Sequence, residues 1–207
     1  MEFDVWLTLL LASIAISVSP GAGAVVSMNY GIKYGLKKSY SAIMGLQVGL
    51  FAQTFIVVIG LGALIMQSVM LFNVIKWIGV LYLIYLGLSK IFEKVELVEE
   101  GEHLKNYSAK KAFITATFIN LTNPKATVFL VAFIPQFLNP NESLWLQFTI
   151  IVATLCAVDI FVMTGYSSMA SKLKFLIKDI KAMKIQNRIT GAFLIVAALF
   201  MSTAKRA

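Results

Sequence analysis

The chain has 207 residues, of which 59% are hydrophobic and 14% are charged, and its mean hydropathy is +0.83. A water-soluble domain carries about a quarter charged residues, so this composition argues against a soluble protein and favours one whose solvent is mostly lipid. The formal net charge of +8 resides between apolar runs, which indicates a membrane surface rather than nucleic acid as the partner. A single cysteine, Cys156, excludes an intrachain disulfide and a cysteine metal cluster.

Six apolar segments approach the length needed to cross about 30 Å of hydrocarbon. They are residues 5–28, 40–66, 70–90, 113–137, 145–170 and 187–204. The first follows the acidic residues Glu2 and Asp4 rather than a basic segment, so we expect a retained span and not a signal peptide. The prediction is an all-α integral membrane protein with six transmembrane helices in one domain, residues 1–207.

Lysine and arginine gather in the connections after the first, third and fifth spans. Because cytoplasmic loops carry an excess of these residues, we expect those three loops in the cytoplasm and both termini outside. Residues 92–111, which mix charges of both signs and contain the sole histidine, should form a cytoplasmic loop. Residues 172–188 could form a basic amphipathic helix along the membrane surface.

Two spans contain a proline well inside the apolar run. Pro20 lies in Ser19-Pro20-Gly21 of the first span, and Pro124 lies in Asn123-Pro124-Lys125 of the fourth. Proline removes a helical hydrogen bond and clashes with the preceding turn, so both helices should be broken there. Matched breaks predict two inverted three-helix repeats, about residues 1–91 and 112–207, with a midplane site that attracts a carboxylate.

Other residue pairs fit the same repeat with a different offset. Gln47 and Asp159 are 112 residues apart, as are Gly79 and Gly191, whereas the two prolines are 104 residues apart. The difference requires a longer connection in the second half, which we place at residues 138–144.

Two charged side chains lie at membrane depth, Lys125 in span four and Asp159 in span five. A charge there costs about 2.5–3.5 kcal/mol on insertion scales, so each should face the interior with a partner. An ion pair between them is the economical hypothesis. It could be a static structural pair. Alternatively, Asp159 could be the proton-coupling carboxylate, with Lys125 binding a substrate carboxylate or acting on the aspartate's protonation.

Neutral amides within the spans have two possible roles. Gln47, Asn120 and Asn123 could join helices, which is the commoner role, or bind a substrate. Asn123 lies beside a predicted helix break, so we expect it to touch the substrate.

Five motifs carry a resemblance to a known family. They are S-P-G-A-G at 19–23, G-L-Q-V-G-L at 45–50, K-W-I-G-V-L-Y-L-I-Y-L-G at 76–87, N-L-T-N-P-K at 120–125 and P-Q-F at 135–137. Over nearly its whole length the chain resembles the lysine-exporter (LysE/RhtB) family, in its homoserine and threonine efflux branch. The resemblance implies a proton-driven exporter of homoserine, homoserine lactone, threonine or similar amino acids in the bacterial inner membrane. Ala22 and Ala24 depart from the family's bulkier or polar residues, which leaves the substrate open.

The resemblance implies a transporter and not an enzyme, with an amino acid, protons and the bilayer as partners, no nucleic acid, no cofactor and no metal. A homodimer is a further possibility. The candidate proton-coupling residue is Asp159, and the candidate substrate-binding residues are Ser19, Pro20, Gly21, Gln47, Asn120, Asn123, Pro124 and Lys125.

Three alternatives remain open from the sequence. The cargo could be another amino acid, such as leucine or lysine, because the same charged groups would accept either. A metal-cation exporter would need several carboxylate, histidine or cysteine side chains at depth, where the sequence offers Asp159 alone. A membrane scaffold without transport activity would not need the paired helix breaks.

Overall fold

The computed structural model describes residues 1–65, 69–92, 107–139, 141–172 and 180–203, and the regular elements in these ranges are all helical. The elements are α1 Phe3–Val18, α2 Ala22–Ile65, α3 Val69–Phe92, α4 Ala109–Leu121, α5 Pro124–Phe133, the 3-10 helix η1 Ile134–Phe137, α6 Leu144–Lys172 and α7 Ile180–Thr203.

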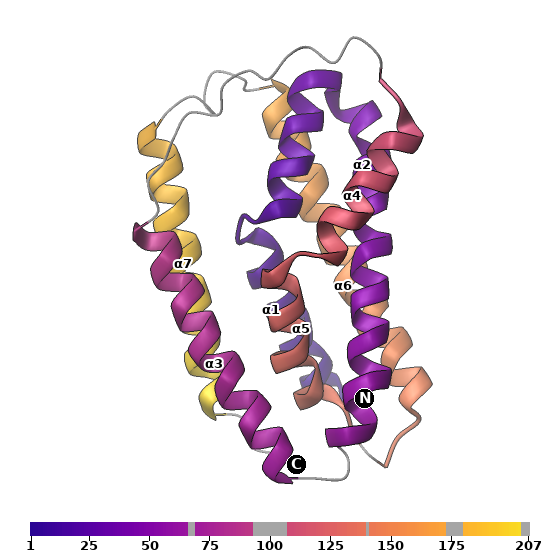
Figure 1. Ribbon diagram of the computed structural model, residues 1–207, viewed down its shortest axis with the longest axis vertical. Coiled ribbons are helices and arrows are strands. Elements are labelled where there is room, and N and C mark those ends of the chain that lie inside the picture. Colours follow the sequence, from indigo (N-terminus) through magenta and orange to yellow (C-terminus); the bar gives the residue numbers. More distant parts are fainter. Residues whose placement is uncertain (66–68, 93–106, 140, 173–179, 204–207) are drawn as a thin grey trace.

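The helices form a main body and an adjoining pair (Figure 1). In the main body α2 packs along both α6 and α4, and α1 packs on α6. Helices α3 and α7 run antiparallel to each other at one side of this body and contact it through α5 and α1. The start of α1 and the end of α7 lie toward the lower end in Figure 1, while the start of α4 and the end of α6 lie toward the upper end.

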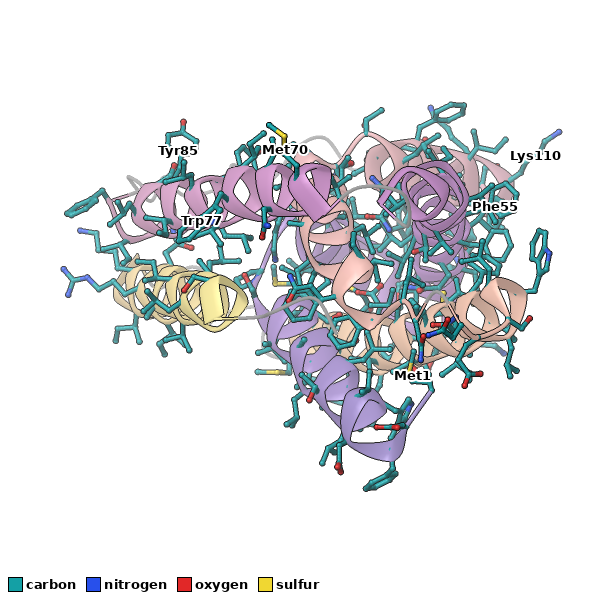
Figure 2. The ribbon with its side chains drawn as sticks, turned by 90° about the horizontal axis from the view of Figure 1, so that it is seen from below. Met1, Phe55, Met70, Trp77, Tyr85 and Lys110 are labelled. Atoms are coloured by element: carbon teal, nitrogen blue, oxygen red, sulfur yellow. The ribbon has the colours of Figure 1, made fainter. Side chains whose placement is uncertain are left out.

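The described residues expose many large apolar side chains and bury several polar ones among an otherwise apolar core. Ser13, Ser39 and Ser167 are completely buried, whereas Phe161 is 81% exposed and Met70 78% exposed. Figure 2 shows Met70 and Tyr85 pointing away from the bundle on the outer side of α3. A large exposed apolar surface is expected when the surrounding solvent is lipid. The prediction of an all-helical fold is confirmed for the described residues, and the exposed apolar surface is consistent with a membrane protein.

By length and hydropathy, two described helices could each cross a membrane alone. They are residues Ala22–Gly60 of α2 and the whole of α6. Helix α4 together with α5 and η1 could make a third crossing, bent by 52° at its break. The division into six spans as two inverted repeats stays a prediction.

Both predicted helix breaks are present at the predicted residues. Helix α1 ends at Val18 and α2 begins at Ala22, so Ser19, Pro20 and Gly21 form the first break. In the second, Asn123 caps the start of α5, where its side-chain oxygen accepts a hydrogen bond from the Lys125 backbone N–H at 3.1 Å. Pro124 is the first residue of α5, a position where the missing N–H costs nothing.

The connection between the first two spans is shorter than predicted. Residues 29–39 are helical on either side of Gly35, where the backbone leaves the helical conformation in a sharp turn with φ 77° and ψ 168°. This region of backbone conformation is essentially limited to glycine, so one residue replaces a loop. The connection between η1 and α6 instead takes residues 138–143, close to the predicted longer connection at 138–144.

Two further predicted segments lie partly outside the described residues. The structure describes neither residues 93–106 of the predicted loop at 92–111 nor residues 173–179 of the predicted amphipathic helix at 172–188. At the end of the first segment, α4 begins at Ala109, earlier than predicted, because the Ser108 side chain caps it by accepting from the Lys111 N–H.

Glycines allow the helix backbones to approach closely at their crossings. A Cβ atom on Gly45 of α2 would collide with the carbonyl oxygen of Phe113 in α4. On α7, Gly191 packs against Gly87 of α3, and each glycine would meet the carbonyl oxygen of the other if it carried a side chain. This pair is 104 residues apart, like the two prolines. It therefore differs from the predicted match of Gly191 with Gly79.

We predict that Gly45→Ala destabilises the protein by about 1–3 kcal/mol, because the added methyl overpacks against rigid backbone. Thermal unfolding of the purified protein in detergent measures this as a lower midpoint. Gly60→Ala in the same helix is the control, since its Cβ would meet no atom within 4 Å, and it should be neutral or stabilising by about 1 kcal/mol. Equal midpoints for Gly45→Ala and the wild type would show that the α2–α4 crossing is not close-packed.

Candidate functional site

A cavity of about 70 Å³ with both polar and apolar lining residues lies where the two helix breaks meet. Its polar lining residues are Ser17, Ser19, Asn120, Asn123, Lys125 and Asp159. Its apolar lining residues include Leu46, Leu50, Phe129, Leu130, Leu155 and Met163. Since about 10–15 Å³ of cavity suffices for one water molecule, this space can hold several waters or the polar head of a small ligand.

Asp159 of α6 lies at the junction of three helices. Its Oδ2 accepts a hydrogen bond from Gln47 Nε2 of α2 at 2.7 Å, and its Oδ1 accepts one from Ser17 Oγ of α1 at 3.2 Å. Two donors from separate elements thus hold the carboxylate at the edge of the cavity. Gln47 and Asp159, which the sequence matched across the proposed repeats, are in direct contact.

Ser17 is a member of the site that the sequence analysis missed. A signal was present, because Ser13 and Ser17 are spaced by four residues in an otherwise apolar helix and both are buried. This spacing places two hydroxyl groups on one face. Such a face should point into the protein rather than into lipid.

Lys125 reaches across from the second break to the first. Its Nζ donates hydrogen bonds to the carbonyl oxygen of Ile16, at 3.0 Å, and to the carbonyl oxygen of Ser19. Lys125 and Asp159 line the same cavity. The ion pair between them stays a prediction, since the hydrogen bonds described for each group go to other partners.

The second break is closed by neutral groups. Gln53 Nε2 of α2 donates to the carbonyl oxygen of Leu121, the last residue of α4, at 3.1 Å and to Thr127 Oγ1 at 2.7 Å. Asn120 Nδ2 donates to the carbonyl oxygen of Leu46 at 2.6 Å. The Asn120 amide therefore joins α4 to α2. Joining helices was one of the two roles that the sequence left open for it, the other being substrate binding.

Two buried oxygen atoms beside the cavity have no hydrogen-bond partner among the described residues. They are Ser19 Oγ and Gln47 Oε1, in residues that are 4% and 6% exposed. Leaving a buried polar atom unpaired costs about 1–3 kcal/mol, so these atoms are suited to bind water or a ligand group in the cavity.

The structure brings most of the predicted site residues together. Ser19, Gly21, Asn123 and Lys125 line the cavity with Asp159 and Asn120, and Gln47 contacts Asp159. Pro20 and Pro124 belong to the two breaks and are not among the lining residues. Their roles in binding or coupling stay predictions.

The model of the LysE type translocator family matches residues 14–205. The chain belongs to the LysE type translocator family. The resemblance carried by the five motifs is thus confirmed. The protein is a membrane transporter and not an enzyme, and both helix breaks and Asp159 of this translocator lie within the matched residues.

Several relatives of this translocator match over most of their length. The chain is 38% identical over 205 residues to an uncharacterized membrane protein of Vibrio cholerae, covering 99% of this chain and 100% of the relative. It is 38% identical over 203 residues to the homoserine/homoserine lactone efflux protein of Salmonella typhimurium, covering 98% of each. It is 30% identical over 173 residues to the leucine efflux protein of Klebsiella pneumoniae, covering 79% of this chain and 81% of the relative. No solved structure matches the translocator.

We predict that Gln47→Leu and Asp159→Leu are energetically coupled. Each removes one partner of the same buried hydrogen bond, so the double variant should be about 0.5–3 kcal/mol more stable than the sum of the single effects implies. Unfolding of the wild type, the two single variants and the double variant in detergent gives the coupling energy. A cycle of Gln47→Leu with Thr149→Val, an exposed position on α6, should be additive. Additivity in both cycles would show that the Gln47–Asp159 contact contributes nothing.

Proposed function

We propose that this translocator exports small neutral amino acids, namely homoserine, homoserine lactone, threonine or a close analogue, across the bacterial inner membrane in exchange for protons. The observation that carries the proposal is the cavity at the paired helix breaks, with Asp159 and Lys125 in its wall. The relative named for homoserine and homoserine lactone efflux, 38% identical over 98% of the chain, supports this cargo.

The substrate carboxylate is placed near the starts of α2 and α5. Both helices begin at the cavity, where Gly21, Gly23 and Asn123 are lining residues. Helix N-termini carry a partial positive charge and N–H groups without intrahelical partners, so they attract anions. The charge of Lys125 adds to this attraction.

The substrate ammonium is placed at Asp159, and its side-chain hydroxyl at Ser19. A carboxylate is the natural partner of an ammonium group, and Asp159 is the acidic residue among those lining the cavity. The buried Ser19 Oγ, without a partner among the described residues, can exchange a hydrogen bond with a substrate hydroxyl. Homoserine and threonine both carry such a group.

Proton coupling follows from competition at Asp159. An ionised carboxylate binds the substrate ammonium, and a protonated carboxyl group does not. A proton arriving from outside therefore releases the substrate there, and loss of that proton to the cytoplasm restores the binding site. Each cycle moves substrate outward and a proton inward.

Leucine is the second candidate cargo. One wall of the cavity is apolar, with Phe129, Leu130, Leu155 and Met163, and a relative named for leucine efflux is 30% identical. Competition between unlabelled leucine and labelled homoserine distinguishes the two. A metal-cation cargo is less well supported, since no three His, Cys, Asp or Glu residues gather in the described part of the chain.

We further propose that both termini face outward. The turn within α2, the start of α4 and the end of α6 lie at the end of the bundle opposite the start of α1 (Figure 1). These segments carry basic residues, among them Lys33, Lys37, Lys38, Lys110, Lys111 and Lys172. An excess of lysine at one end supports a cytoplasmic location for that end. The reciprocal contact of Gly87 and Gly191 supports the inverted-repeat relation.

We predict that cells expressing the protein lose preloaded labelled homoserine or threonine faster than empty-vector cells, and that a protonophore or Asp159→Asn removes this excess. The substitution leaves a side chain of similar size but removes the carboxylate charge for which the substrate ammonium and the proton compete. Asp4→Asn, at an exposed position in the first turn of α1, is the matched control and should export normally.

Membrane insertion of each variant is checked by its yield in purified membranes. Excess efflux that persists in Asp159→Asn would contradict the coupling role. Absence of excess efflux for the wild type would contradict the proposed cargo.

A further inference from the structure

Helix α1 ends inside the protein and exposes backbone carbonyl groups that need partners. The Ala15 carbonyl accepts from the Ser19 N–H at 3.2 Å, and the Val18 carbonyl accepts from the Tyr166 hydroxyl of α6 at 2.6 Å. The carbonyl oxygens of Ile16 and Ser19 both accept from Lys125 Nζ. The end of α1 is thus completed by side chains distant in sequence.

The position of the Lys125 stem explains the glycine at residue 21. A Cβ atom on Gly21 would lie 3.3 Å from Lys125 Cδ, tighter than an ordinary van der Waals contact. The absence of a side chain at Gly21 therefore leaves open the path along which the Lys125 side chain reaches α1. The second break supplies the lysine, and the first break supplies both the open path and the carbonyl oxygens that accept from its ammonium.

The second break shows that a helix end here does not require a charge. The terminal carbonyl of α4, at Leu121, is satisfied by the neutral amide of Gln53. What differs at the first break is the surrounding charge. Both breaks carry the negative end of a helix dipole, but at the first break Ser17 in the last turn of α1 also holds the Asp159 carboxylate. Backbone carbonyl oxygens at a negative helix end are the ligands that transporters with broken helices use for monovalent cations.

We propose that the Lys125 ammonium is a built-in cation, occupying a monovalent-cation site formed by the carbonyl oxygens of Ile16 and Ser19 at the end of α1. Because the tethered ammonium fills this site, the stability and the export rate of the wild-type protein should not depend on Na⁺ or K⁺. Removal of the side chain opens the site to a free monovalent cation, either an alkali ion or a small alkylammonium. Lys125 is in this view a positioning residue, which fixes the first break beside Asp159.

The direct test is thermal unfolding of purified Lys125→Ala in choline chloride, NaCl, KCl or methylammonium chloride. Choline serves as the baseline, because its quaternary nitrogen is surrounded by methyl and methylene groups and has no N–H to donate to the carbonyl oxygens. We expect Na⁺ or methylammonium to raise the midpoint of Lys125→Ala by about 3 °C or more relative to choline, because a ligand that binds only the folded state stabilises it. The wild type should show the same midpoint in all four salts.

Two variants control for other effects of the substitution. Lys125→Met removes the charge but fills the space with an apolar stem, so its midpoint should fall and no cation should restore it. Lys110→Ala removes an exposed lysine at the start of α4, which points away from the bundle in Figure 2, and should behave as the wild type. If Lys125→Ala yields no folded protein, the unfolding midpoint of Lys125→Ser is measured in the same four salts instead.

Transport gives an independent readout that rests on the proposed function. In proteoliposomes with choline, Lys125→Ala should export homoserine about tenfold or more slowly than the wild type, because the charged hydrogen bonds at the break are lost. Na⁺ or methylammonium should restore part of that rate in Lys125→Ala and leave the wild type unchanged. Lys125→Met should remain slow in every salt.

The outcomes separate the two proposals. Failure of every cation to stabilise Lys125→Ala, or wild-type stability of this variant in choline, overturns the built-in cation. A wild-type protein that exports none of the tested amino acids overturns the proposed function, while the unfolding experiment still decides the cation site.

Discussion

A helix that breaks at membrane depth exposes backbone groups for which lipid offers no partner, and this constraint shapes the rest of the structure. Each unsatisfied group costs several kcal/mol in hydrocarbon. At the first break Lys125 and Tyr166 satisfy carbonyls of α1, and at the second Gln53 satisfies the terminal carbonyl of α4. Because these donors come from α5, α6 and α2, closing the breaks also fixes how the central helices pack. The glycines at the α2–α4 crossing permit the close approach that this packing requires.

The same solution creates the candidate site. Two breaks brought together leave the starts of α2 and α5 around one cavity, with Asp159 held at its edge by Gln47 and Ser17. A zwitterion needs a positive and a negative pole close together, and this cavity supplies both. Membership of the LysE type translocator family fits such a site, because a translocator must bind its cargo at a depth reachable from both sides. The proposed exchange of a proton for the substrate ammonium requires no group beyond Asp159.

The sequence predicted the helical membrane class, both breaks and the family, because proline at membrane depth and long apolar runs have few alternative explanations. It also matched Gln47 with Asp159, which are in contact. It could not predict that the connection between the first two spans shortens to a turn at Gly35, since this glycine resembles any other glycine in a basic segment. It placed Lys125 against Asp159 on charge alone. The competing partners, the carbonyls of Ile16 and Ser19, exist only after the break has formed and carry no side-chain signature.

The most direct test of the central claim, that substrate binds in the cavity between the breaks, is the reactivity of a cysteine placed in its wall. Cys156→Ser removes the sole native thiol, and Ala126→Cys then introduces one at a lining position. Homoserine at about ten times its Kd should slow modification by a small thiol reagent about tenfold, because occupied sites are protected. Ser143→Cys, at an exposed position before α6, should react at an unchanged rate. An unchanged rate at residue 126 in protein that still exports homoserine would contradict the account.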